Sequence, residues 1–342
     1  MSYFGFGKKK STVNPKEASI KGTSQQTKEN QMSNEEKYGK AWLLIVGERE
    51  RTHGLQMLSE LDGAGFIEGT IALSMFCENL SERKALIKKA AEADNPEGLW
   101  EYCGFLPHSY RPNPNDASDA LWEKTCLKAA EKGSVDAMNE MGNIYHRRGH
   151  FAESMYWYAM ASAHDHAEGK MGMMGITVEW VQNGRPRDFV KGSQEFDEAR
   201  HQCAIAYLEL LSNTDFSSTP DEIIKLVLDG VPIACYFVGD YYESVGNDEM
   251  AFKMYQALAY EKDAHAMKCC ADMLFSGKGT PRDPQSATLM YMEAAKKGDR
   301  TAMFIAGELT KASNKELAAY WYGVSHTRGY EHSIERLIQL AQ

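Results

Sequence analysis

The chain has 342 residues, of which 43% are hydrophobic and 25% charged, a composition typical of a folded protein too long for one ordinary compact core. Its formal net charge of −10 disfavours general binding to nucleic-acid phosphates, so we expect no nucleic-acid partner. The sequence contains no run of eighteen apolar residues, so we expect no membrane span and no membrane partner.

Residues 1–33 are polar and basic. The first thirty residues contain six lysines and two glutamates, a net charge of +4, which leaves −14 for the rest of the chain. Such a segment buries too little apolar surface to fold, so we predict a disordered tail. Three lysines interrupt any secretory signal near the start, and the seven scattered cysteines form no CxxC pair. These features predict a cytoplasmic protein with reduced thiols.

Residues 34–64 have the apolar spacing of an N-terminal helical pair. From residue 65 to residue 330, a pattern of small–x3–apolar–small–x2–large residues recurs, as in Ala137, Met141, Gly142 and Tyr145. Its positions fall on one face of a helix. Copies begin at residues 69, 98, 137, 167, 199, 234, 266 and 302. A repeat length in the low thirties indicates an α-solenoid, here of about eight units.

A second amphipathic segment follows several copies, so each unit is predicted to be a helix–turn–helix hairpin. These segments are residues 151–163, 248–260, 284–297 and 315–327. The pattern is irregular at residues 183–231, and residues 331–342 are predicted to form a C-terminal capping helix. We therefore predict an all-α fold, a right-handed superhelix of stacked hairpins.

Residues 266–298 resemble the Sel-one-like repeat, a relative of the tetratricopeptide repeat. The matching residues are Ala266, Ala271, Gly277, Gly279, Asp283, Ala287, Tyr291, Ala294, Ala295 and Gly298. The resemblance implies that the Gly-x-Gly opens the loop within the repeat and that Asp283 begins the second helix. It also implies a protein that assembles complexes, but it does not indicate which complex.

No motif predicts catalysis. The sequence lacks a phosphate-binding loop, a GxSxG nucleophile and a distinct pair of catalytic carboxylates, so we predict no enzyme, no catalytic residue and no cofactor. The most metal-like cluster is His164-Asp165-His166, but zinc needs three or four converging ligands. These residues lie at a repeat junction, where a solvated turn is the simpler interpretation. We therefore predict no metal site.

The concave face of a solenoid is lined by the first helix of each hairpin, and its side chains opposite the core are the candidate binding residues. They are Trp100, Asn139, Asn143, His146, His201, Tyr236, Asp240, Lys268, Asp272, Phe304 and Glu308. We predict an adaptor or scaffold that binds a protein or peptide through this face; the oligomeric state stays open. The alternatives are a self-assembling structural protein, or a metal-dependent regulator or enzyme that uses His164, Asp165 and His166 or residues 183–195.

Overall fold

The structure is a computed structural model. It describes residues 32–47, 50–109, 112–113, 115–164, 169, 171–172, 239, 242–243, 246–260 and 262–342. Within these ranges, all regular secondary structure is helical, as the sequence predicts. The predicted tail, apart from its last two residues, and the irregular segment 183–231 lie outside the described residues.

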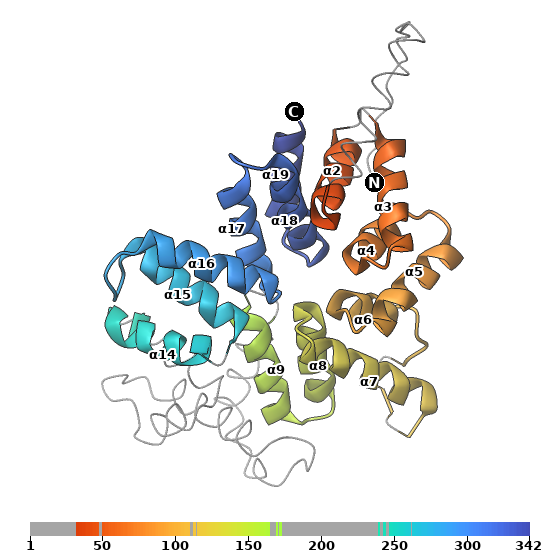
Figure 1. Cartoon of the computed structure of the whole chain (residues 1–342). Coiled ribbons are helices and arrows are strands. Elements are labelled where there is room, and N and C mark those ends of the chain that lie inside the picture. Colours follow the sequence, from red (N-terminus) through yellow and green to blue (C-terminus); the bar gives the residue numbers. More distant parts are fainter. Residues whose placement is uncertain are drawn as a thin grey trace, which may run out of the picture.

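The helices follow one another as antiparallel hairpins (Figure 1). Before residue 165 they are α2 (Asn34–Val46), α3 (Arg51–Gly63), α4 (Ile67–Met75), α5 (Leu80–Glu92), α6 (Pro96–Cys103), α7 (Ala117–Glu131), α8 (Val135–Arg147) and α9 (Phe151–Ala163). After residue 247 they are α14 (Asp248–Tyr260), α15 (Ala264–Ser276), α16 (Pro284–Lys296), α17 (Arg300–Thr310), α18 (Lys315–Thr327) and α19 (His332–Ala341). Helices α9, α14, α16 and α18 coincide with the four predicted second segments to within one residue.

The helix ends follow from local chemistry. The Asp283 carboxylate accepts hydrogen bonds from the backbone N–H groups of Gln285 and Ser286, each at 3.1 Å, and Pro284 occupies the first helical position. Gly277 ends α15 with a φ of 77°, a left-handed conformation that favours glycine. The resemblance to the repeat family had implied both features.

Small residues let the two helices of a hairpin approach closely. In α8, Ala137 and Met141 are fully buried, and a Cβ atom added to Gly142 would lie 2.5 Å from the ring of Tyr158 on α9. The same contact recurs at Gly307 of α17, where an added Cβ would lie 2.5 Å from the ring of Tyr322 on α18. The small position of the sequence pattern is therefore the site where a tyrosine ring packs closely against the partner helix.

The array of hairpins closes on itself (Figure 1). Helix α2 packs against both α18 and α19, so the first and last described helices form one interface. Tyr38 and Trp42 of α2 are almost completely buried there, and the Asn314 amide donates a hydrogen bond of 2.8 Å to Glu36. Helix α2 of the predicted N-terminal pair thus contacts α19, the predicted C-terminal capping helix.

Candidate functional site

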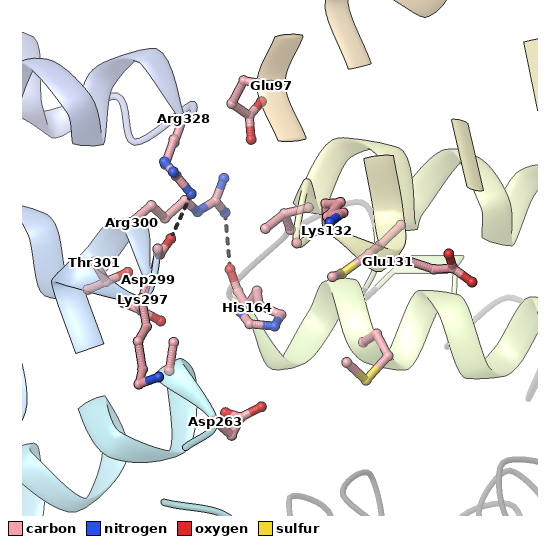
Figure 2. A pocket seen from close by; sticks show the side chains of 16 residues that line it. Glu97, Glu131, Lys132, His164, Asp263, Lys297, Asp299, Arg300, Thr301 and Arg328 are labelled. Carbon is pink, nitrogen blue, oxygen red and sulfur yellow. Dashed lines mark hydrogen bonds between the residues drawn. The ribbon is translucent and has the colours of Figure 1, made fainter. Parts of the chain in front are cut away.

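The turns that join one hairpin to the next meet near the middle of the array and line a cavity of about 230 Å³ that many charged residues border (Figure 2). Turn residues come from the junctions α7–α8, α14–α15 and α16–α17, and α6, the end of α9 and the end of α18 complete the lining. The charged lining residues are Glu97, Glu131, Lys132, Asp263, Lys297, Asp299, Arg300 and Arg328. Four carboxylates therefore face four basic groups in this cavity.

The two arginines are fixed by backbone carbonyl groups. Arg300 donates from Nη2 to the carbonyl oxygen of His164 at 3.1 Å, which ties the start of α17 to the end of α9. Arg328 donates from Nη1 to the carbonyl oxygen of Gly298 at 3.2 Å. Both hydrogen bonds are drawn in Figure 2. Because guanidinium groups stay charged at neutral pH, they give this side of the cavity a permanent positive charge.

Glu97 supplies an opposing carboxyl group on the α6 side of the cavity. Glu97 is 9% exposed, and its side chain extends towards Arg328 and Arg300 in Figure 2. Burial raises the pKa of Glu97 to about 7, although the positive charges of Arg328 and Arg300 partly oppose this rise. The carboxyl group therefore changes its protonation state near neutral pH.

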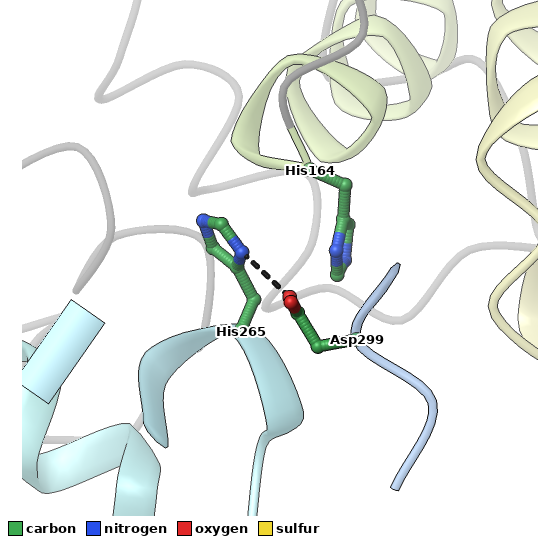
Figure 3. Close-up of side chains that lie close together, drawn as sticks. All are labelled: His164, His265 and Asp299. Atoms are coloured by element: carbon green, nitrogen blue, oxygen red, sulfur yellow. Dashed lines mark hydrogen bonds and ion pairs between the residues drawn. The ribbon is translucent and has the colours of Figure 1, made fainter. Parts of the chain in front are cut away.

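Next to this cavity, His164, His265 and Asp299 converge from three different segments (Figure 3). Their ligand atoms all lie within 4.8 Å of one another. The His265 ring nitrogen Nδ1 lies 3.0 Å from Asp299 Oδ2, and the rings of His164 and His265 have centroids 5.0 Å apart. His265 and Asp299 are buried, and His164 is half-buried.

The protonation of this cluster follows from its burial and its internal contacts. Burial, helped by the charge of His265, lowers the pKa of His164 to about 4. Burial opposes the charged form of His265, but neighbouring Cys269 and the contact with Asp299 outweigh it and hold the pKa of His265 well above its usual value. Burial likewise opposes ionisation of Asp299, yet His265 keeps the pKa of this carboxyl group below its usual value. At neutral pH the cluster therefore holds an ion pair beside a neutral imidazole.

The sequence predicted only one member of this cluster. His164 was named as the most metal-like position, together with Asp165 and His166, which lie outside the described residues. His164 lies in the turn after α9, as expected, but it is half-buried against the ring of His265 and not fully solvated. One feature of the sequence indicates a role for Asp299: it lies three residues before the small residue Ala302, where it caps α17. That His265 and Asp299 meet His164 depends on how the hairpins stack.

The structure places the predicted concave-face residues in different environments. His146 is exposed at the end of α8, and Trp100 and Phe304 are half-buried. Asn139 is only 7% exposed, contrary to our expectation of a solvent-facing side chain, because α8 packs between α7 and α9. Three further candidates, His201, Tyr236 and Asp240, lie outside the described residues.

Asn143, Asp272 and Glu308 share one arrangement, which we call the tyrosine ladder. Each directly follows the small residue of its repeat and accepts a hydrogen bond from a tyrosine hydroxyl of the next helix. The donors are Tyr158 at 2.6 Å, Tyr291 at 2.6 Å and Tyr322 at 2.7 Å. Lys268, another candidate, forms an ion pair of 3.1 Å with Asp272.

Among the described residues, no helix is long and apolar enough to cross a membrane. No family model matches the chain, and no curated protein matches its sequence.

Solved structures align with most of the chain at low identity. The chain aligns over 82% of its length with 57% of a protective antigen of uropathogenic Escherichia coli that displays an SLR fold, at 19% identity and a TM-score of 0.37. It aligns over 83% of its length with 79% of a Sel1 repeat protein from Oxalobacter formigenes, at 16% identity and a TM-score of 0.35. These structural neighbours are Sel1-repeat (SLR) proteins, and the chain spans little more than half the length of the first.

Proposed function

We propose that the protein is a non-enzymatic adaptor that binds a protein or peptide partner along the first helices of its hairpins. The observation that carries this proposal is the tyrosine ladder, which repeats one polar arrangement on α8, α15 and α17. A surface that repeats at the period of the hairpins suits an extended partner, since each hairpin offers the same kind of contact.

The ladder is also held in place before a partner arrives. The Asp272 carboxylate accepts from Tyr291 through Oδ1 and pairs with Lys268 through Oδ2. Glu308 is held in the same way by Tyr322 and Arg336. Side chains that are already ordered lose less conformational entropy on binding, so a fixed row of polar groups supports both affinity and register.

End-to-end self-assembly is a weaker alternative because it needs free faces at the two ends of the array. Helices α2, α18 and α19 cover one another, so the outermost faces of the described helices are occupied within one chain. The adaptor function therefore fits the closed array better than a polymer does.

The test starts with affinity purification of the tagged full-length chain from its native host, followed by reconstitution with the purified partner. The ladder variant, His146→Ala/Lys268→Ala/Asp272→Asn, alters the ladder residue Asp272 and two further candidate residues on the first helices α8 and α15. Its control, Lys88→Ala/Lys253→Ala/Glu293→Gln, makes matched changes on the second helices α5, α14 and α16, where these side chains are about half exposed. We expect the ladder variant to raise the dissociation constant by about tenfold or more, a loss of about 1.4 kcal/mol, and the control to leave it unchanged.

Equal affinity of the ladder variant, the control and the unaltered chain would contradict the use of this face. A variant without residues 1–33 tests whether the partner binds this segment and not the helical array. If the partner is lost only with that segment, the binding element is the segment and not the helical array.

A further inference from the structure

We propose that His164, His265 and Asp299 bind one divalent transition-metal ion of the zinc class, and that this ion ties the end of α9 to the starts of α15 and α17. The site goes beyond the adaptor function and does not depend on it.

The donor set is the first argument. Figure 3 shows the Asp299 carboxylate between the two imidazole rings, so the three side chains lie close together. Imidazole nitrogen and carboxylate oxygen are the ligands that zinc and its neighbours in the transition series accept. The described donor atoms lie within 4.8 Å of one another, and tetrahedral ligands stand about 3.3 Å apart. A movement on the order of 1 Å by the half-buried His164 would complete the geometry.

The ligands are held by contacts outside the coordination shell. Asp299 uses Oδ1 to accept a hydrogen bond of 2.6 Å from the backbone N–H of Ala302. Its Oδ2 pairs with His265 Nδ1 in the metal-free protein, and a bound ion would take the place of the proton between these two atoms. The backbone carbonyl of His164 is held by Arg300. Such supporting contacts fix ligand orientation in metal sites and reduce the entropy lost when the ion binds.

The electrostatic balance is compatible with a cation. The lining of the same cavity holds four basic groups, which would repel a divalent ion, and four carboxylates, which would attract it, so the two kinds of charge balance. Three protein ligands leave one coordination position open. Because His164 and Asp299 also line the cavity of about 230 Å³, a water molecule has room to fill that position.

The place of the ligands in the chain indicates a structural role. His164 precedes His265 by about one hundred residues, and the contact of Arg300 with His164 already spans 136 positions. An ion at this point would close that long loop and stabilise the folded state, because the unfolded chain does not bring the three ligands together.

The experiment uses the full chain freed of metal with a chelator, and titrates it with Zn²⁺ by calorimetry and with Co²⁺ by absorption spectroscopy. We expect one equivalent to bind with a dissociation constant in the micromolar range or below, and the Co²⁺ spectrum to show a four-coordinate ion without thiolate charge transfer. We also expect Zn²⁺ to raise the unfolding temperature. The absence of thiolate charge transfer distinguishes this site from binding by the free cysteines.

The variants are His164→Gln and Asp299→Asn, of which the second keeps the oxygen that caps α17. His146→Gln, an exposed histidine outside the cluster, is the matched control. We expect both site variants to lose at least tenfold in Zn²⁺ affinity and to lose the thermal shift, and the control to keep both. Less than a tenth of an equivalent bound to the unaltered chain would overturn the proposal. Equal binding by the site variants, with metal-free circular dichroism like that of the unaltered chain, would overturn it as well.

Discussion

At the scale of single residues, the fold depends on a repeated contact in which a tyrosine ring packs against a small residue of the neighbouring helix. The small residue removes a side chain from one helix so that the tyrosine ring of the next can lie against its backbone, as Tyr322 does at Gly307. The tyrosine hydroxyl then reaches the polar side chain that follows, here Glu308. Burial, together with this hydrogen bond to Glu308, raises the pKa of Tyr322, so the hydroxyl stays protonated and keeps donating.

Replacing Gly307 by alanine tests this close packing. An added methyl group would lie 2.5 Å from the Tyr322 ring, so we expect a loss of about 2 kcal/mol in unfolding free energy despite the higher helix propensity of alanine. Urea unfolding followed by circular dichroism measures the effect. Gly63→Ala is the control, since an added Cβ at Gly63 meets no atom within 4 Å. A Gly307 variant as stable as the control would contradict the packing argument.

Glu97 makes the stability of the folded state depend on pH. Burial raises its folded-state pKa to about 7, above the unfolded value, so the folded state binds the extra proton between these two values. The stabilising contribution is therefore complete at low pH and is lost as the pH rises through about 7.

Glu97→Gln should remove this dependence. We expect the variant to gain stability relative to the unaltered chain as the pH is raised from about 5 to about 8, by at most about 3 kcal/mol. Comparing the two proteins at each pH cancels the titration of all other groups. A stability difference that does not change with pH would show that Glu97 is not protonated in the folded state at pH 5.

At the scale of helices, capping side chains set where each element begins. The Asn95 side chain accepts from the backbone N–H groups of Glu97 and Gly98, each at 3.0 Å, and starts the short helix α6. Ser134 holds the same position before α8, but its buried hydroxyl makes no hydrogen bond within the described part of the chain. These two residues occupy the same place in the repeat and differ in what they contribute.

We expect Asn95→Ala to cost about 1 kcal/mol, because two backbone N–H groups lose their acceptor. Ser134→Ala should be neutral or slightly stabilising, since it removes a buried hydroxyl without a partner. Thermal unfolding of the two variants side by side gives the comparison. Equal destabilisation by both would mean that the hydrogen bonds of the cap contribute little.

The helices were predictable because their causes are local. Apolar spacing fixed α9, α14, α16 and α18 to within a residue, and Asp283 with Pro284 marked the start of α16. The exposure of single side chains was less predictable. Asn139 lies on the side of α8 opposite the small-residue pattern, yet it is buried, because packing covers two sides of that helix.

At the scale of the whole molecule, the closed array is the feature that the sequence did not reveal. The pattern of each repeat reports how a hairpin packs on its neighbour, but closure depends on the total rotation accumulated over many hairpins. Because the rotation adds up over many hairpins, a small difference in the rotation per repeat decides whether α2 contacts α18. The cluster of His164, His265 and Asp299 escaped prediction for the same reason, since it forms between hairpins far apart in the chain.

Gly39 on α2 provides a test of closure. A Cβ atom at this position would overlap the backbone carbonyl oxygen of Glu316 on α18, and neither backbone can move while the helices stay in contact. We expect Gly39→Ala to separate α2 from α18, to raise the radius of gyration in small-angle scattering and to increase the binding of an apolar dye, because Tyr38 and Trp42 lose their cover. Gly63→Ala again serves as the control. An unchanged radius of gyration and unchanged dye binding would rule out closure as seen here.

Closure also sets an order of events during synthesis. Glu36 and Asn314, which join α2 to α18, stand 278 positions apart. At a translation rate of about 5–20 residues per second, α2 leaves the ribosome on the order of 15–60 seconds before its partner. During that interval the aromatic face of α2 has no native cover on the α18 side, so the nascent chain offers a binding site for chaperones that the finished protein no longer has.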